Sequence, residues 1–92
     1  MLKLNPPRPT FAQDLTDEER SIMQQHSAYW RDLMSKGFVV AFGPVIDPKV
    51  VYGLGIVAAE SFEQVEEFIK NDPADKLGDY EYYQMMAVVP EK

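Results

Sequence analysis

The stretch FVVAFGPVIDPKVVYGLGIVAA, residues 38–59, contains two runs that are rich in β-branched and aromatic residues. Such runs favour extended strands. The segment DPK, residues 47–49, separates them, and aspartate followed by proline is typical of a turn. We therefore expect residues 38–47 and 50–59 to pair as an antiparallel hairpin.

A helix is predicted on each side of this hairpin. Before it, TDEE at residues 16–19 matches the T-x-x-E capping box, and the helix that it begins should run to Lys36, because Gly37 favours a stop. After the hairpin, SFEQ at residues 61–64 resembles a second capping box. The apolar residues of FEQVEEFIK, residues 62–70, then recur at helical spacing.

One more strand is expected near each end of the chain. MLKLN, residues 1–5, alternates weakly and is stopped by the prolines of the 6–15 loop, and DYEYYQMMAVV, residues 79–89, has strand composition. The order β-α-β-β-α-β predicts an α+β, ferredoxin-like fold: a four-stranded antiparallel sheet with two helices on one face. We expect residues 1–92 to form a single domain.

The apolar strands also predict a partner. An antiparallel sheet with one face in water should alternate apolar and polar residues, but residues 38–42 and 54–59 are almost continuously apolar. Two helices cover only one face. We therefore expect the second face to be buried in a homodimer or a higher homo-oligomer.

Composition argues against several classes of partner and site. The formal net charge of −6 opposes binding to nucleic acid. No apolar run approaches about 18 residues, the N-terminal segment does not resemble a secretion signal, and cysteine is absent, so we expect a cytoplasmic protein that does not bind membranes. A single histidine makes a metal site improbable, and Gly53-Leu54-Gly55 lacks the third glycine of a dinucleotide motif. We predict neither metal nor cofactor.

The most informative position is the single histidine, His26. Together with Ile22, Tyr29 and Leu33 it recurs at spacings of four, three and four, so the imidazole should point inward. A buried imidazole needs hydrogen-bond partners, because leaving it unpaired costs about 1–3 kcal/mol. His26 is then either a satisfied core histidine or a general base in the wall of a pocket. Tyr29 and Trp30 are expected in the core or an interface.

Asp72 is the second candidate, and it also has two interpretations. It precedes Pro73, where an aspartate can cap a short helical turn. It also lies in a loop at the rim of the predicted sheet, and such loops carry many functional residues. Position alone does not separate a structural cap from a catalytic carboxylate.

Four segments together resemble the YciI-like (YCII-related) domain family. They are His26-x-x-Tyr29, the stretch KGFVVAFGP that ends in Gly43-Pro44, the helix that begins at Ser61, and Asn71-Asp72-Pro73-Ala74. The resemblance implies a ferredoxin-like fold that dimerises into an α/β barrel. It further implies an active-site pair formed by His26 and Asp72, with Gly43 and Pro44 near the substrate. Relatives in the wider superfamily act on small, often aromatic or lactone-like molecules.

The segment PPRPTF, residues 6–11, departs from the shorter loop of many members and is a candidate lid. Its Arg8 could bind an anionic substrate, although a surface arginine is the plainer interpretation. Tyr29 or Arg8 could orient the substrate. If Asp72 steadies the imidazole, His26 could move a proton in a cofactor-independent elimination or isomerisation. The alternatives are a non-catalytic module that binds a small metabolite, and a dimeric assembly protein without a ligand.

Overall fold

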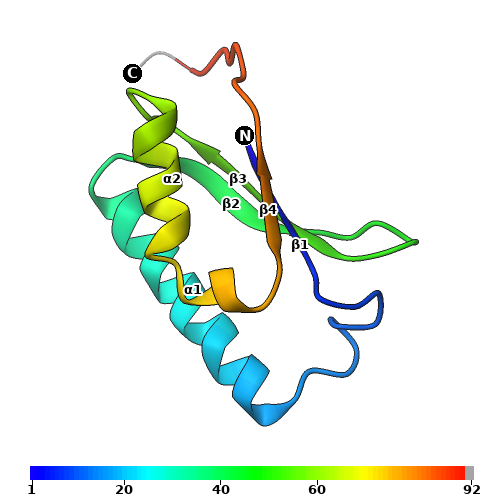
Figure 1. Ribbon diagram of the computed structural model, residues 1–92. Helices are drawn as coiled ribbons and strands as arrows, with labels where there is room; N and C mark the ends of the chain where they lie inside the picture. Colours follow the sequence, from blue (N-terminus) through cyan, green and yellow to red (C-terminus); the bar gives the residue numbers. More distant parts are fainter. Residues whose placement is uncertain (91–92) are drawn as a thin grey trace.

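Four antiparallel strands form one sheet in the order β2-β3-β1-β4 (Figure 1), in a computed structural model that describes residues 1–90. The elements are β1 (Leu2–Asn5), α1 (Asp17–Ser35), β2 (Val39–Val45), β3 (Tyr52–Val57), α2 (Phe62–Lys70), the 3-10 turn η1 (Pro73–Lys76) and β4 (Asp79–Tyr82). The β-α-β-β-α-β order and the strand pairing confirm the predicted ferredoxin-like α+β fold.

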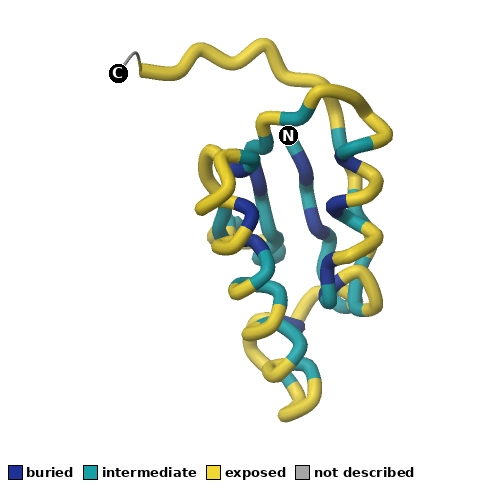
Figure 2. The backbone as a smooth tube through the Cα atoms, turned by 90° about the vertical axis from the view of Figure 1, so that its left-hand side faces the viewer, coloured by how far each residue is buried: buried dark blue, intermediate teal, exposed yellow. Residues whose placement is uncertain are grey.

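Both helices pack against the same side of the sheet (Figure 1). The buried core between the two layers takes residues from β1, α1, β2 and α2; they are Leu2, Trp30, Leu33, Val39, Val65 and Phe68. Burial alternates along β1, because successive side chains of a strand point to opposite faces. The buried positions of β1 are dark blue in Figure 2.

The first helix begins as its sequence predicts. The Thr16 hydroxyl accepts a hydrogen bond from the Glu19 N–H at 3.1 Å, and the Glu19 carboxylate accepts one from the Thr16 N–H at 3.0 Å. At α2 only half of the expected box forms. Ser61 accepts from the Gln64 N–H at 3.2 Å, whereas the Gln64 side chain accepts from the N–H of Glu60 rather than of Ser61.

The prediction that the last strand continues to residue 89 is wrong. β4 ends at Tyr82, and the next residue exchanges backbone hydrogen bonds with Met1. Among residues 1–90, no strand pairs with residues 84–89, so their strand-like composition has no ladder to join. Residues 83–90 are exposed throughout (Figure 2).

The sheet face that points away from the helices remains partly exposed. The register places Leu54 opposite Lys3 and Gly43, and Ile56 opposite Ala41. These side chains lie on the sheet face opposite to that of the buried Leu2 and Leu4.

We find no described helix that is both long and apolar enough to cross a membrane.

Gly78 joins η1 to β4 where the chain passes very close to β1. A Cβ atom at this position would lie 2.0 Å from the carbonyl oxygen of Asn5, which is far inside the contact distance. Only glycine fits there without moving the backbone. This close approach brings the start of β4 against the end of β1, beside the site described next.

Candidate active site

His26 and Trp30 lie one turn apart on α1 and face the sheet. Residues four apart on a helix share a face, and here the ring centroids are 6.1 Å apart. The His26 side chain is 15% exposed and Trp30 is 2% exposed. The inward orientation predicted for the histidine is therefore confirmed, and it retains some access to solvent.

Asp72 enters the site from the opposite half of the fold. α2 ends at Lys70, and the chain then turns into η1 with Asp72 as its N-cap and Pro73 at the first position. The Asp72 Oδ1 atom accepts the Ala74 N–H at 2.9 Å, which confirms the predicted cap. The carboxylate itself is completely buried.

The structure brings the side chains of His26 and Asp72 into direct contact. The imidazole Nδ1 lies 2.8 Å from each carboxylate oxygen. An ionised carboxylate only accepts hydrogen bonds, so we assign the ring proton to Nδ1. In the neutral ring, Nε2 then carries a free lone pair.

The second ring nitrogen of His26 is open to solvent. Within residues 1–90, Nε2 has no hydrogen-bond partner, and every buried side-chain nitrogen or oxygen does have one. Nε2 is therefore not buried. A fixed Nδ1–H and an accessible Nε2 lone pair are the arrangement of an imidazole that can accept a proton from another molecule.

Two further side chains donate to Asp72, and the sequence analysis assigned neither of them to the site. The Trp30 indole Nε1 donates to Oδ2 at 2.7 Å, and the Tyr80 hydroxyl on β4 donates to the same oxygen. Two weak signals were present in the sequence. Trp30 follows His26 by four residues, and Tyr80 alternates with Tyr82 along the last strand.

These donors keep the buried carboxylate ionised. Burial alone would raise the pKa of Asp72, but the hydrogen bonds from His26, Tyr80, Trp30 and the Ala74 N–H outweigh it and lower the pKa below its usual value. Burial and the neighbouring negative charge of Asp72 raise the pKa of Tyr80, so its hydroxyl stays protonated and donates.

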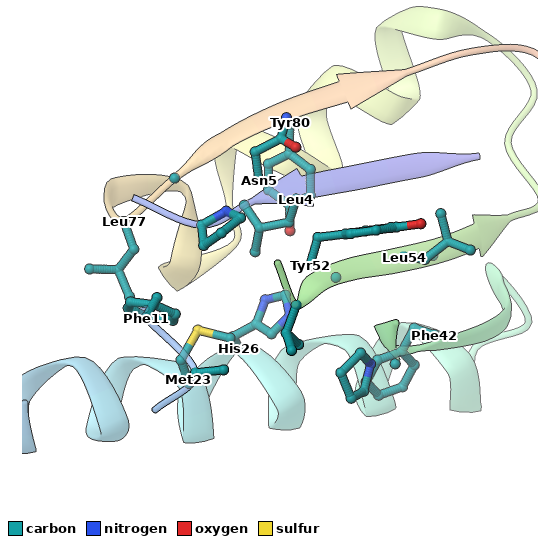
Figure 3. Close-up of a pocket in the computed structure, with 18 of the residues that line it drawn as sticks. Leu4, Asn5, Phe11, Met23, His26, Phe42, Tyr52, Leu54, Leu77 and Tyr80 are labelled. Atoms are coloured by element: carbon teal, nitrogen blue, oxygen red, sulfur yellow. The ribbon is translucent and has the colours of Figure 1, made fainter. Parts of the chain in front are cut away.

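A cavity of about 340 Å³ opens beside His26, between α1 and the sheet (Figure 3). Figure 3 shows His26 between Met23 and Phe42 on one wall, with Leu4 on the opposite side. Most lining side chains are apolar or aromatic; the polar exceptions are Asn5, His26, Ser27, Tyr52 and Tyr80. Within residues 1–90, no acidic residue, lysine or arginine lines it.

Asp72 does not line the cavity, although both His26 and Tyr80 do. A ligand in the cavity therefore meets the carboxylate only through these two side chains and Trp30, which also lines the cavity. Within residues 1–90, no group of three His, Cys, Asp or Glu side chains is close enough to hold a metal ion.

Of the four other residues predicted near a substrate, two line the cavity and two do not. Gly43 and Pro44 are in its wall. The Tyr29 hydroxyl donates instead to the carbonyl of Phe68 at 2.7 Å. Burial, followed by the charge of Asp72, raises the pKa of Tyr29 to about 12. Tyr29 therefore links the two helices and does not contact the cavity.

Arg8 is occupied by carboxylates. Its guanidinium donates to both oxygens of Glu19 at 2.8 Å and to Asp14 Oδ1 at 2.8 Å. The Arg8 side chain, followed by the Thr16 N–H, lowers the pKa of Glu19 to about 2. Arg8 does not line the cavity, so we do not assign it to an anionic substrate.

The loop that carries Arg8 nevertheless forms one end of the cavity. Its lining members are Pro6, Pro7, Phe11, Ala12 and Leu15. The ion pair of Arg8 with Glu19 ties this loop to the first turn of α1, and its pair with Asp14 lies within the loop. The loop over residues 6–15 is thus a wall of the cavity that is fastened to the helix.

Comparison with known proteins places these observations in a family. The model of the YCII-related domain matches residues 2–89. A similar solved structure is 5-chloro-2-hydroxyhydroquinone dehydrochlorinase from Burkholderia phenoliruptrix AC1100, in complex with 2,5-dihydroxybenzoquinone. The two chains share 24% sequence identity and a TM-score of 0.62 over 90% of this chain and 91% of the other, which is a likeness of fold. No curated protein matches this chain.

Proposed function

We propose that this chain, which belongs to the YCII-related domain family, is an enzyme that moves a proton on a small organic molecule with His26 as the proton-transfer group. One observation carries the proposal: Nδ1 of His26 is held by a buried carboxylate while Nε2 remains open beside an apolar cavity. No cofactor is needed for this chemistry.

The proposed step begins with a substrate proton bound to carbon or oxygen. The Nε2 lone pair of His26 takes this proton, and the electron pair of the broken bond stays on the substrate. In an elimination, that pair forms a new double bond as a leaving group departs with its own electrons. In an isomerisation, Nε2 returns the proton to a different substrate atom. Asp72 stabilises the imidazolium that exists between the two events.

The cavity favours a flat, ring-sized substrate without a localised anionic group such as a carboxylate or a phosphate. Aromatic side chains, among them Trp30, Phe42 and Phe11, form much of its wall, and no lysine or arginine in the described part of the chain lines it. A carboxylate or phosphate would meet no opposite charge there. The similar dehydrochlorinase was solved with a quinone, and removal of hydrogen chloride is an elimination. We extend that reaction class to this chain as part of the proposal.

The exchange of the ring hydrogens of 2,5-dihydroxybenzoquinone for deuterium in D₂O tests the proposal without requiring the natural substrate. It is followed by ¹H NMR as the loss of the ring-hydrogen signal. Chloride release from 5-chloro-2-hydroxyhydroquinone tests elimination directly. We expect the parent protein to accelerate exchange above the uncatalysed rate and His26→Asn to lose about 10²–10⁴-fold of that acceleration. The asparagine amide can still donate to Asp72, but it has no nitrogen at the Nε2 position.

Gln25→Ala is a matched control, because Gln25 is exposed on the same helix and outside the cavity. It should leave exchange unchanged. Undiminished exchange by His26→Asn would contradict the proposal. Binding of the quinone by the parent without any accelerated exchange would favour the other function considered, a module that only holds a metabolite.

We further propose that two copies of the chain dimerise through the sheet face that points away from the helices. The support is the partly exposed apolar side chains on that face, including Leu54 and Ile56, in a chain that is otherwise strongly charged. Ile56→Glu should halve the molar mass measured by light scattering. Ile46→Glu is the control, since Ile46 is 76% exposed in the connection between β2 and β3. An unchanged mass for Ile56→Glu would refute this interface.

A further inference from the structure

We infer that Trp30 and Tyr80 are positioning residues: by donating to Asp72 they fix the carboxylate that holds His26 with its Nε2 toward the cavity. This inference deepens the proposed function and rests on it for its catalytic meaning. Neither side chain takes the substrate proton in this scheme. Both act through Asp72.

The donors surround the carboxylate from three elements. Oδ2 accepts from Trp30 of α1 and from Tyr80 of β4, and Oδ1 accepts from the backbone N–H of Ala74 in η1. His26 Nδ1 lies at 2.8 Å from both oxygens. A carboxylate has about four lone-pair sites, so this arrangement fills nearly all of them. The group therefore has a single well-determined orientation.

Burial makes the two donors irreplaceable by water. The Asp72 side chain has no exposed surface, and Trp30 is 2% exposed. If one donor is removed, no solvent molecule stands beside the carboxylate to take its place. The other donor and His26 are then the side chains that remain to hold the carboxylate, and the His26 ring will follow it when it shifts.

Both donors hold their protons. An indole N–H only donates, and the burial of Tyr80 together with the charge of Asp72 raises the pKa of its hydroxyl. The carboxylate is thus already satisfied when Nε2 accepts a proton. That proton remains on the imidazole, the Nδ1–H bond stays intact, and Asp72 stays ionised throughout the step.

Tyr80 differs from Trp30 in one useful respect. Both side chains line the cavity, but Trp30 is buried whereas Tyr80 is half-buried, and the Tyr80 hydroxyl contacts the carboxylate. A ligand can therefore press on the tyrosine ring and alter the contact with Asp72. Trp30 is locked in the core beside Leu2 and Leu33 and serves as the rigid donor.

The tautomer of the histidine ring tests this inference without any substrate. His26 is the single histidine and Trp30 the single tryptophan, so each gives an unambiguous ¹⁵N NMR signal. In the parent protein, we expect the neutral ring to show the Nδ1–H tautomer. Tyr80→Phe keeps the aromatic ring and removes one donor, and Trp30→Phe replaces the indole by a smaller aromatic ring and removes the other donor. In both we expect a mixed tautomer signal, and in Tyr80→Phe also a shifted indole N–H resonance.

Tyr82→Phe is the matched control. Tyr82 lies two residues along β4, packs against the same core and has no hydrogen bond to Asp72. It should leave the histidine signal as in the parent. In the exchange assay, Tyr80→Phe and Trp30→Phe should each lower kcat by about tenfold or more. Tyr80→Phe, which keeps the lining ring, should change KM less than twofold, the pattern expected when only the reacting geometry is disturbed.

The outcomes separate the inference from the proposed function. Parent tautomer signals and parent kcat in folded Tyr80→Phe and Trp30→Phe would overturn the inference. A changed tautomer in these variants, with no proton exchange by the parent, would uphold the positioning of Nε2 and overturn the enzymatic function. If Trp30→Phe fails to fold, Tyr80→Phe alone decides, because its side chain is only half-buried.

Discussion

The two helices of this fold begin alike and end differently. Thr16 and Ser61 each cap a helix with a hydroxyl, but α1 has 19 residues and α2 has 9. The inward side of α1 carries an imidazole and an indole beside a cavity. The inward side of α2 carries the buried Val65 and Phe68 and packs without comparable polar groups.

The short second helix creates the site. Because α2 stops at Lys70, the chain crosses toward α1 as the turn η1, and this turn delivers Asp72 to His26. A second helix as long as the first would occupy that path. The candidate site therefore lies where two topologically equivalent halves cease to match, one half contributing the histidine and the other the carboxylate.

Removal of the carboxylate should break this arrangement most severely. Asp72→Ala leaves the donors of His26, Trp30 and Tyr80 without an acceptor in a buried place, so we expect a loss of about 3–5 kcal/mol in the free energy of unfolding. Urea denaturation measures this loss. Asn71→Ala, at the neighbouring exposed position, should change stability by less than about 0.5 kcal/mol. A loss below 1 kcal/mol for Asp72→Ala would show that the donors find other partners.

A substitution that creates a cavity under α2 should destabilise the fold without changing the geometry of the candidate site. Val65→Ala removes buried methyl groups of α2 and should cost about 2 kcal/mol of unfolding free energy. The ¹⁵N signals of His26 should remain those of the parent. Altered ¹⁵N signals of His26 in this variant would mean that the packing of α2 also determines the geometry around His26.

Lowering the pH should destabilise the protein at Asp72, by less than the two substitutions above. Because the pKa of Asp72 is lowered in the folded state, its ionisation stabilises the protein above the ordinary aspartate value near 3.8, and this contribution is lost as pH falls below that value. Asp72→Asn should abolish it, so the two stability curves should converge in acid with a slope difference of at most about 1.4 kcal/mol per pH unit. Asp14, Glu19 and Glu81 keep their own acid sensitivity in both proteins. Parallel curves would exclude a lowered pKa at Asp72.

The smallest expected effect is at the floor of the cavity under α1. A Cβ atom at Gly53 would lie 3.4 Å from Leu4 Cβ, an ordinary contact, so Gly53→Ala should fold. It should narrow the cavity and weaken binding of 2,5-dihydroxybenzoquinone several-fold, as isothermal titration calorimetry can measure. Unchanged affinity would place the ligand elsewhere.

Local rules predicted most of the fold. Helix caps and strand composition depend on residues close in the chain, which is why the helix starts and the central hairpin are found at the expected places. The predicted last strand extends too far because residues 83–89 have strand composition, whereas a strand also requires a neighbour to pair with.

The site was accessible to sequence reasoning only in part. The helical spacing of His26 predicts its orientation, and the proline after Asp72 predicts its cap, but their contact spans 46 residues and was suggested by family resemblance. The sequence does not reveal that Trp30 and Tyr80 donate to Asp72. An aromatic side chain with one polar atom is expected to be a core residue until its hydrogen-bond partner is known. The sequence offers Arg8 as a ligand for an anion because its own carboxylate partners cannot be recognised from spacing.

Because ion pairs of Arg8 fasten the 6–15 loop, the ionic strength of the solution should affect one wall of the cavity, although the described residues that line the cavity are uncharged. The Arg8 pairs with Asp14 and Glu19 lie near the surface, where dissolved salt screens attraction over about 10 Å at 0.1 M. Added salt should therefore loosen the end wall while leaving the apolar lining untouched. Ligand association and dissociation should both become faster in concentrated salt. The rate constants of binding should therefore depend on salt far more than the affinity does.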